Sequence, residues 1–406
     1  MHSRHCFGLD SARLFAATLG LAAHVSCAEL QVWTVTETRH VLRSELPGNQ
    51  REARLAAARN EWVSFQILVR ADEPMRGVSM KAGELRAPDG KGSGAIRWRF
   101  YREHQLHLET GTYRNADFKP DWYPDPLIPF EHPLAGEKLN DARFKAVPFD
   151  LSAGETHGFW VDFYVSSNAV AGEYRGACRI TAEQDQVVEQ TWTAPGQGGA
   201  DSAWGDLYGA IDIWCPLFSL HRQESAAVRQ ALGETIWTYT ALCQGEPTPW
   251  WHIDYPLLNY RVPTWMAWRC RMRGLLYWGG LSYWTNVDDS WQQAPYYAGN
   301  GAFQQGQKGI LYNGEGSLVY PARAVGYDGI VPTIRLKALR DAVEDYDYLA
   351  LLEHLGKAAE AEAIVKPLAE SFSRWDRNPA AYESARARLA ALILSSSSRG
   401  NTTPRR

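Results

Sequence analysis

The pattern of hydrophobic and polar positions divides the chain into two regions with different periods. In the first, apolar residues alternate with others over short stretches, notably 32–36, 63–69 and 159–165. A period of two residues is typical of half-buried β-strands. Short strands at this spacing, separated by turn-forming residues, predict an all-β domain over residues 29–182, arranged as a β-sandwich.

The second region alternates short apolar runs with helical patterns. Runs at 209–214 and 234–242 predict strands, and WMAWRCRM predicts a helix within 260–273. The stretch GLLYWGGLSYW at 274–284 then reads as a buried strand, since its apolar run is too short for a helix and glycines flank it. Strands that alternate with helices predict a parallel, barrel-like β/α arrangement over 206–333.

Helical spacing dominates the C-terminal region, residues 334–394. Apolar residues recur at helical intervals from Ile334 to a stop signal at Gly356, and two further helices are predicted at 358–371 and 379–394. The polar tail 395–406 is predicted to be disordered. The glycine-rich stretch 183–205 has no apolar period and is predicted to be a junction between the two regions.

A proline-rich segment, DWYPDPLIPFEHP at 121–133, interrupts the first region. Its prolines favour an extended, rigid backbone. We expect it to cover the surface, with a position at the domain interface or substrate rim as the alternative.

Composition and charge narrow the class of partner. The net charge of −4 gives neither a basic footprint for nucleic acid nor a polybasic membrane patch. Residues 1–28 resemble a secretory signal with cleavage after Ala28, and no other stretch is long and apolar enough to span a membrane. We therefore expect a secreted or periplasmic protein, and the sequence leaves its oligomeric state open.

Cysteine and histidine spacing indicates neither a metal site nor a cofactor. The cysteines are widely spaced without a C-x-x-C pair, and no H-E-x-x-H motif occurs. Free buried thiols are expected, with one disulfide among Cys215, Cys243 and Cys270 as the alternative.

Aromatic residues supply the first functional signal. The chain holds 17 Trp and 19 Tyr, and Trp278, Tyr283 and Trp284 follow the strand of GLLYWGGLSYW closely. Flat apolar rings at the C-terminal mouth of a β/α barrel are suited to stacking on sugar rings. The alternative is that these rings pack in the core or in loops.

Several motifs occur in a specific order. LYGAIDIWCP is followed by WTY, a Trp-rich helix, GLLYWGGLSYW, GEGSLVYP and IRLKALRDAVEDYDYLALL, while ARNEWVSFQ, YPDPLIP and AGEYRG lie in the predicted sandwich. Together they resemble glycoside hydrolase family 123 over roughly 29–182 and 206–355. One departure is Ala342, where the family usually has Gly.

The resemblance implies a fold, a reaction and a set of site residues. The fold would be an N-terminal β-sandwich, a (β/α)8-type barrel and C-terminal helices. The activity would be that of a β-N-acetylgalactosaminidase, in which the substrate's own acetamido oxygen attacks the anomeric carbon. An adjacent Asp–Glu pair orients that group and transfers protons. Seven residues would contact the glycan: Trp214, Trp237, Tyr239, Arg261, Trp278, Tyr283 and Trp284.

The Asp–Glu pair is missing from its expected place. In the family it lies between the sandwich and LYGAIDIW, and here that stretch is too short for a full barrel of about 200–250 residues. The barrel is therefore expected to be incomplete, as after a large internal deletion.

No other acidic pair replaces it well. Asp72-Glu73 is expected to form a turn, and Glu344-Asp345 to lie on a solvated or ion-paired helix face. The remaining candidates are Asp212 at a strand end and Asp288 and Asp289 after GLLYWGGLSYW, where loop capping is the alternative.

Two functions follow. The first is a glycoside-hydrolase-like protein that acts on N-acetylhexosamine-containing glycans with impaired or lost catalysis. The second is a non-catalytic secreted protein that binds carbohydrate or has a structural role.

Overall fold

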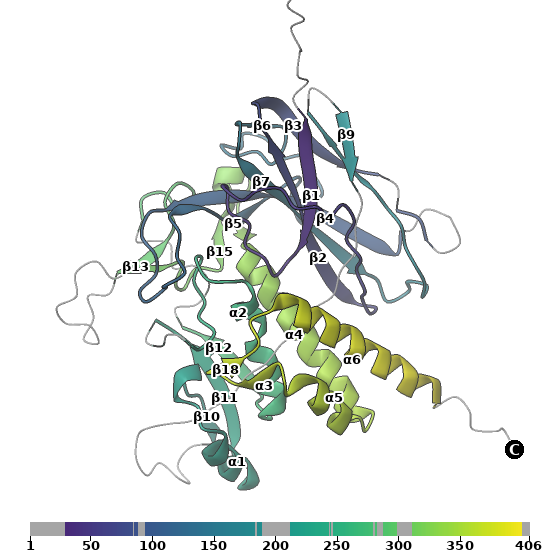
Figure 1. The fold of residues 1–406 in the computed structure, drawn as a ribbon, viewed down its shortest axis with the longest axis vertical. Helices are drawn as coiled ribbons and strands as arrows, with labels where there is room; N and C mark the ends of the chain where they lie inside the picture. The colour runs from purple at the N-terminus through teal and green to yellow at the C-terminus, as the bar shows by residue number, and fades with distance from the viewer. Residues whose placement is uncertain are drawn as a thin grey trace, which may run out of the picture.

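The computed structural model describes residues 29–83, 85–87, 94–182, 185–188, 212–242, 244, 247–278, 281, 287–298 and 311–399. Antiparallel sheets form the N-terminal part, and a parallel β/α region and a group of helices form the rest (Figure 1). The predicted signal at 1–28 and most of the junction at 183–205 lie outside the described residues.

Two antiparallel sheets make up the N-terminal domain. The larger has the order β1-β2-β7-β4-β5, and the smaller has the order β6-β3-β8-β9. The larger sheet comprises β1 (Leu30–Thr36), β2 (Glu61–Ala71), β4 (Ile96–Leu108), β5 (Asp121–Pro129) and β7 (Thr156–Val165). The smaller comprises β3 (Met75–Ala82), β6 (Phe149–Leu151), β8 (Cys178–Thr181) and β9 (Asp185–Val188).

One hydrophobic core joins the two sheets. Phe159, Val161 and Phe163 of β7 pack with Val78 of β3 and Ile180 of β8. This face of β7 is the one that the alternating pattern predicts. The opposite face carries Trp160 and Asp162, which are also buried, because the helical part of the molecule covers that side.

The proline-rich segment is a buried edge strand, so the expectation of a surface cover is wrong. β5 pairs only with β4 in its sheet, and an edge strand tolerates proline because one side needs no backbone donors. It is buried because the C-terminal part packs on it. Pro126 forms a bridge with Thr333, just before helix α4. The segment therefore lies at the domain interface.

The parallel sheet has three strands in the order β10-β11-β12 and does not close into a barrel within the described residues. Its strands are β10 (Ile213–Trp214), β11 (Thr235–Thr240) and β12 (Gly274–Tyr277), and α1 (Gln223–Ala231) connects the first two. β12 lies at the edge and is half-buried, which corrects the expectation of a fully buried strand. Burial is incomplete because β11 is the single strand that pairs with it in the part of the chain that the structure describes.

Among the described residues, three short hairpins and two 3-10 helices lie in the otherwise irregular regions. The hairpins are β13 (Tyr296–Ala298) with β14 (Leu311–Asn313), β15 (Val319–Pro321) with β16 (Ile330–Pro332), and β17 (Ala369–Ser371) with β18 (Arg374–Trp375). The 3-10 helices are η1 (Phe218–Leu220) and η2 (Ala322–Val325).

The long helix α4 (Ile334–His354) is the centre of the C-terminal part. Thr333 caps its first turn by accepting a hydrogen bond from the Leu336 amide, as expected for a threonine at this position. It is surrounded by α2 (Leu258–Arg261), α3 (Pro263–Arg269), α5 (Ala358–Val365) and α6 (Pro379–Arg399). Helix α6 continues through residues 395–399, the start of the tail predicted to be disordered.

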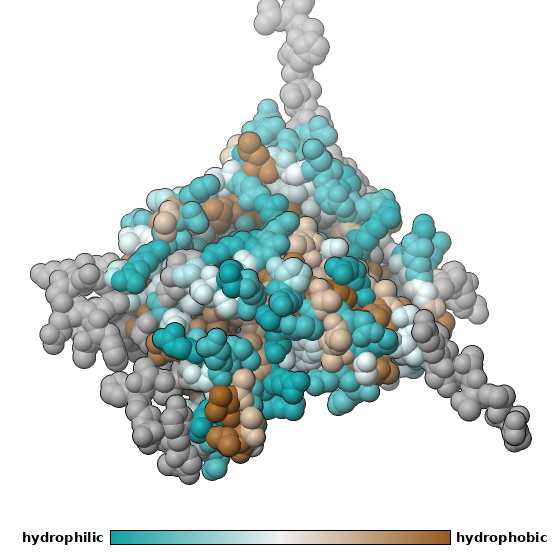
Figure 2. Space-filling view, turned by 60° about the horizontal axis from the view of Figure 1, so that its bottom comes forward, coloured by the Kyte–Doolittle hydropathy of each residue, from teal (hydrophilic) through white to brown (hydrophobic). Residues whose placement is uncertain are grey.

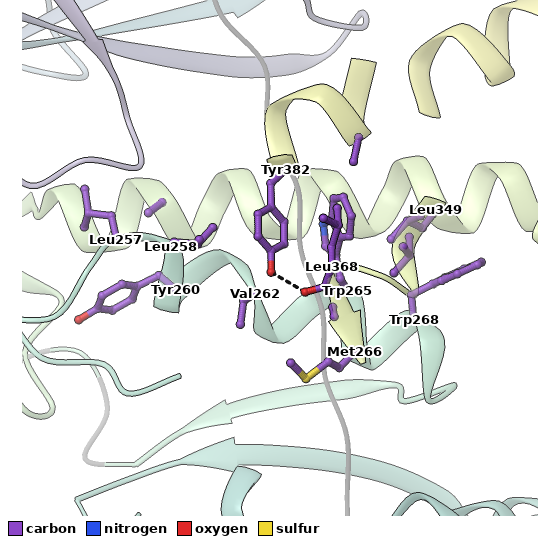
Figure 3. Close-up of a cluster of buried hydrophobic side chains, with 14 of the residues drawn as sticks. Leu257, Leu258, Tyr260, Val262, Trp265, Met266, Trp268, Leu349, Leu368 and Tyr382 are labelled. Atoms are coloured by element: carbon purple, nitrogen blue, oxygen red, sulfur yellow. Dashed lines mark hydrogen bonds between the residues drawn. The ribbon is translucent and has the colours of Figure 1, made fainter. Parts of the chain in front are cut away.

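A second large core fills the space between these helices. Trp265 and Met266 of α3, Leu349 of α4 and Tyr382 of α6 belong to it (Figure 3). The Tyr382 hydroxyl donates to the Leu368 carbonyl oxygen at 2.9 Å, so the one polar atom that this ring buries is satisfied (Figure 3).

Buried ion pairs connect α4 to the sandwich. The ammonium group of Lys337 binds the Asp162 carboxylate, and Arg340 approaches the same carboxylate at 3.3 Å. These two positive charges outweigh the effect of burial and hold the pKa of Asp162 well below its usual range. Farther along α4, Glu344 accepts a hydrogen bond from the Trp62 amide at 2.9 Å.

A second network involves the acidic dipeptide Glu344-Asp345. Asp345 pairs with Arg261 and with Arg386, which reach Glu37 and Glu61 of the N-terminal domain. Asp345 is thus ion-paired, as expected, whereas Glu344 accepts its hydrogen bond from a backbone amide. Together the two networks hold the sandwich and the helices as one unit.

Candidate active site

Three segments meet at the carboxyl end of the parallel strand β12. Tyr277, the last residue of this strand, contributes a hydroxyl that accepts from the Gly316 amide at 2.8 Å. The same hydroxyl donates to the Trp251 carbonyl oxygen at 3.4 Å. Tyr277 therefore joins the strand end to loop 250–255, which follows β11, and to turn 314–317. Carboxyl ends of parallel strands are where β/α folds place their sites.

Turn 314–317 is fixed by its two glycines and by hydrogen bonds from Arg335. Gly314 and Gly316 have φ angles of 74° and 65°, which favour glycine, so the sequence GEG specifies this turn. Arg335, in the first turn of α4, donates to the carbonyl oxygens of Gly314, at 3.1 Å, and Ser317. Glu315 between the glycines is consequently fixed in position.

Arg335 also connects this turn to the sandwich. Its guanidinium donates to both carboxylate oxygens of Asp125 on β5, at 2.6 and 3.0 Å, and all these atoms are buried. The Tyr320 hydroxyl donates to the same carboxylate at 2.7 Å. A buried bidentate pair with further hydrogen bonds is the arrangement that offsets the cost of burying two charges.

Asp254 fixes loop 250–255 to the sandwich. Its carboxylate accepts from the Thr112 amide at 2.7 Å, the Thr112 hydroxyl at 2.6 Å and the Asn115 side chain at 3.0 Å. Burial raises the pKa of Asp254 in spite of these bonds. The loop positions His252, two residues earlier.

Glu315 and His252 form a buried pair between the loop and the turn. The Glu315 Oε2 atom lies 3.4 Å from His252 Nδ1, and the two side chains are 3% and 0% exposed. Within the part of the chain that the structure describes, neither carboxyl oxygen nor either ring nitrogen has a hydrogen-bond partner. Unsatisfied buried groups of this kind are rare in proteins, and they concentrate where a ligand or a reaction satisfies them.

The environment makes both groups neutral. Burial raises the pKa of Glu315 to about 8, although the nearby positive charge of Arg335 opposes the shift. Burial and the charge of Arg335 lower the pKa of His252 well below its ordinary value. At pH 7 the pair is thus a protonated carboxylic acid beside a neutral imidazole. A carboxylic acid that keeps its proton at neutral pH can act as a general acid.

Aromatic rings enclose the pair. Ring centroids of Trp250, Tyr255 and Tyr312 lie 4.8, 5.8 and 5.7 Å from that of His252. Trp251 stacks on Tyr260 in the adjoining core, with 5.3 Å between centroids. The apolar surroundings explain why the carboxyl stays protonated.

A second aromatic feature lies on one face of the parallel sheet. Side chains alternate between the two faces of a strand, and the register pairs Trp237 with Gly274 and Tyr239 with Leu276. By the same alternation Trp278 follows on this face, where it is 56% exposed and Leu276 is 40% exposed. We call Trp237, Tyr239, Leu276 and Trp278 the open sheet face.

The other face of the sheet is closed by helices. Trp214 and Ile236 share a hydrophobic cluster with Ala226 of α1 and Ala267 of α3. Trp214 is therefore buried, and its indole donates to Glu234 at 2.6 Å. Of the predicted glycan contacts, Trp237, Tyr239 and Trp278 are brought together, whereas Trp214 lies on the opposite face.

The other predicted contacts are not part of this group. Arg261 is buried in the interface network with Glu37 and Asp345. Tyr283 and Trp284 lie outside the described residues. The molecular face in Figure 2 is mainly hydrophilic and shows apolar residues in small separate groups.

The three acidic candidates for catalysis are either exposed or engaged in structural hydrogen bonds. Asp212 and Asp288 are exposed. Asp289 binds Arg143 through both carboxylate oxygens at 2.6 and 2.8 Å and accepts from the Trp291 amide at 3.0 Å. The hydrogen bond from Arg143 is the main reason that the pKa of Asp289 is lowered. Asp289 thus caps its loop, which is the alternative stated for it.

Sequence reasoning missed Glu315 and His252. The available signal for Glu315 was a single carboxylate between two glycines, directly before a short strand in GEGSLVYP. His252 had only its place among aromatic residues in WWHIDY. Neither signal is specific without the fold, because the two residues are far apart in the chain.

No group of three or more His, Cys, Asp or Glu side chains that could hold a metal ion occurs in the described ranges. Within the same ranges, no helix has the length and apolar character needed to cross a membrane. Cys178, Cys215 and Cys270 are free thiols, and Cys243 lies outside the described residues.

The antiparallel N-terminal sheets, the parallel β/α region and the C-terminal helices define a protein with a β domain followed by an α/β domain. Two family descriptions match: the glycoside hydrolase 123 N-terminal domain at residues 33–182, and the glycoside hydrolase 123 catalytic domain at residues 197–352. The chain belongs to glycoside hydrolase family 123. Among curated proteins, none matches this chain.

One solved structure supports the fold. A family 123 glycoside hydrolase from Clostridium perfringens, studied for glycolipid glycan hydrolysis, superposes with a TM-score of 0.64 at 10% sequence identity. The match covers 91% of this chain and 99% of that one. AvmM, which catalyses macrocyclization in alchivemycin A biosynthesis, reaches a TM-score of only 0.19 at 8% identity over 38% of this chain and 73% of its own, too low to indicate a shared fold.

Proposed function

We propose that this protein acts on glycans that end in N-acetylhexosamine, in the manner of a β-N-acetylgalactosaminidase. The observation that carries the proposal is the open sheet face, where Trp237 and Tyr239 of β11 and the exposed Trp278 directly after β12 share one side of the parallel sheet. Aromatic faces in this position are suited to stacking on a sugar ring. The relative from Clostridium perfringens, described in terms of glycolipid glycan hydrolysis, supports a glycan as the substrate.

We further propose that catalysis is slower than in family members with an adjacent Asp–Glu pair. The only Asp-Glu dipeptide of this chain is Asp72-Glu73, and it forms an exposed turn between β2 and β3. A carboxylate pair in a turn of the sandwich domain is not placed to orient an acetamido group at the ends of the parallel strands.

Glycan binding tests the first proposal. Titration calorimetry with an N-acetylgalactosamine-terminated oligosaccharide should show that Trp278→Ala weakens binding by about 1–2 kcal/mol, the scale of one lost aromatic contact. Leu134→Ala is the control, because Leu134 is also an exposed apolar side chain but lies in a loop of the sandwich domain. Equal affinities for wild type and Trp278→Ala would show that the open sheet face does not bind the glycan.

Non-catalytic carbohydrate binding is the second candidate function. The absence of an Asp–Glu pair at the strand ends favours it. Glycan binding that depends on Trp278, without any release of sugar from bound glycan, would select this candidate over the first.

We also propose that residues 1–28 direct export and are removed after Ala28. The apolar stretch from Leu14 to Ala23 and the small residues before the cleavage site support this. Sequencing the N-terminus of the mature protein tests it, and a chain that retains residues 1–28 would contradict it.

A further inference from the structure

We propose that the sandwich domain carries a second glycan-binding site, for sugars that bear a sulfate or carboxylate group, at Arg97 and Arg99 of β4. Their guanidinium groups stack on the rings of Tyr164 of β7 and Trp62 of β2. The site lies in a different domain from the open sheet face. It goes beyond the proposed function, because it requires neither hydrolysis nor an acetamido group.

Strand register places these four side chains together on one face of the larger sheet. Trp62 pairs with Tyr164, and Tyr164 pairs with Arg97, so the three form a row across β2, β7 and β4. Arg99 follows two residues after Arg97 and therefore projects from the same face, with about 7 Å between their Cα atoms. We call Trp62, Arg97, Arg99 and Tyr164 the arginine platform.

The arginine platform faces away from the core of the sandwich. Trp98 and Phe163, which alternate with platform residues along their strands, pack in that core. Arg97 is exposed, and the other three platform residues are half-buried. Solvent therefore reaches the platform in the structure as it stands.

Aromatic rings hold both guanidinium groups in place. The Cζ atom of Arg97 lies 4.8 Å from the ring centroid of Tyr164, and that of Arg99 lies 5.0 Å from the ring of Trp62. The two ring centroids are 5.1 Å apart. Stacking restricts the arginine side chains before a ligand arrives and leaves the N–H groups at the guanidinium edge free to donate.

The two platform arginines carry charge that the described part of the chain does not balance. Neither Arg97 nor Arg99 forms an ion pair with a carboxylate of the described residues. Asp162, opposite Arg99 in the register, is buried and already bound by Lys337 and Arg340. Two positive charges side by side repel each other, and an anion bound between them removes that repulsion.

Helix α4 presents a cation and a neutral acid to the edge of the platform. The Cζ atom of Arg340 lies 5.6 Å from the ring of Trp62. Glu344 accepts from the Trp62 amide at 2.9 Å, and burial together with Asp341 raises its pKa to about 8, so it is largely protonated at pH 7. These groups of α4 therefore do not repel an anion on the platform.

The combination of groups selects the chemistry of the ligand. The guanidinium fork matches an anionic group that accepts two parallel hydrogen bonds. Aromatic side chains beside it suit the apolar face of a sugar ring. A long polyanion such as nucleic acid requires a wider basic surface, which a chain of net charge −4 does not provide. We therefore expect a short acidic glycan.

Calorimetric titration with three ligands that share a lactose unit tests the site. Lactose is neutral, 3′-sulfated lactose carries a sulfate, and 3′-sialyllactose carries a carboxylate. Wild type should bind at least one acidic ligand about 10-fold more tightly than lactose, the effect of one charge-assisted hydrogen bond. Arg97→Gln/Arg99→Gln should lose this preference. Equal affinity of wild type for all three ligands would overturn the proposal, and a preference for one acidic ligand identifies the anion.

Arg175→Gln/Arg323→Gln is the matched control. It also removes two positive charges from exposed side chains, but these arginines already pair with Glu173 and Asp328. We expect the control to keep the wild-type preference for the acidic ligand. An equal loss of preference in both double variants would show that net charge alone attracts the ligand, and the site would then be rejected.

Trp62→Leu tests the contribution of stacking. Arg99 keeps its charge in this variant but loses its ring, so the preference for the acidic ligand should fall about 2–5-fold. Tyr164→Leu removes the ring beside Arg97 and is the second variant, and urea denaturation shows whether each is folded. An unchanged preference in both folded variants would mean that the arginines act as free surface charges, contrary to the proposal.

Trp278→Ala separates this site from the proposed function. The variant should keep the preference for the acidic ligand over lactose, because Trp278 belongs to the open sheet face. Loss of the preference in Trp278→Ala would place the acidic group on the open sheet face and would overturn the arginine platform. A protein without hydrolytic activity still shows the preference, so the two proposals fail independently.

Discussion

Some features of this structure depend on the identity of a single residue. Gly274 shows the most direct case. A methyl group at this position would lie 2.3 Å from the ring of Trp237 on the neighbouring strand, well inside contact distance. The glycine that opens GLLYWGGLSYW thus makes room for an aromatic residue of the open sheet face.

Gly274→Ala should therefore destabilise the protein by about 1–3 kcal/mol, the usual cost of overpacking. Urea denaturation measures the change. Gly94→Ala is the control, because nothing lies within 4 Å of the added methyl group. Similar stabilities for the two variants would show that Trp237 moves away without cost.

A buried carboxyl gives a prediction about pH. Glu103 on β4 has its pKa raised from 4.5 to about 8 by burial. Below pH 4.5 it is protonated in both the folded and the unfolded states. Between pH 4.5 and 8 only the unfolded state releases the proton, so stability falls as pH rises through this range.

Wild type should lose up to about 3 kcal/mol more than Glu103→Gln between pH 5 and pH 7.5, at about 1.4 kcal/mol per pH unit. Urea denaturation of both proteins at the two pH values gives this difference. Parallel pH dependence in the two proteins would mean that Glu103 titrates normally in the folded state.

At the scale of elements, α4 and β5 organise the site. Arg335 from the first turn of α4 binds Asp125 on β5 and also holds turn 314–317. The proline-rich strand β5 thus supplies Asp125, whose negative charge balances the positive charge of Arg335 near Glu315. This is why a segment expected on the surface is buried.

Arg335→Met should cost about 3–5 kcal/mol, because it leaves the Asp125 carboxylate buried and unpaired. The double variant Arg335→Met/Asp125→Asn should regain part of this loss. Arg323→Met removes an exposed ion pair with Asp328 and should leave stability nearly unchanged. A double variant as unstable as the sum of its single variants would contradict this coupling.

Sequence patterns predicted where strands and helices occur better than they predicted how deeply these elements are buried. The alternation of Phe159, Val161 and Phe163 identified the core face of β7, and helical spacing identified α4. The same patterns could not show that a second domain covers β5 or that β12 lies at a sheet edge. Burial at these positions depends on contacts between distant segments.

The candidate site was predictable in the same limited way. The aromatic residues Trp237, Tyr239 and Trp278 were identified because strand ends carry sites in β/α folds. Glu315 and His252 could not be paired from the sequence, since tertiary packing alone brings a lone carboxylate to a distant imidazole. Asp289 was a candidate by position and is a loop cap by its hydrogen bonds.

The whole molecule combines an N-terminal domain of two antiparallel sheets with a parallel sheet that has three strands within the described residues. The Lys337–Asp162 and Arg386–Glu61 pairs connect the sandwich to the helices. The site accordingly depends on both parts, since Asp125 and Thr112 of the N-terminal domain fix the segments that carry Glu315 and His252. Family membership and fold are established, and the central claim that remains is the action on N-acetylhexosamine.

Selectivity for the acetamido group tests that claim most directly. Purified protein is given 4-nitrophenyl N-acetyl-β-galactosaminide and, separately, 4-nitrophenyl β-galactoside, and release of nitrophenol is followed. We predict slow release from the first and none above background from the second, because only the first carries the oxygen that attacks the anomeric carbon. Equal cleavage of both, or of the plain galactoside alone, would contradict the account.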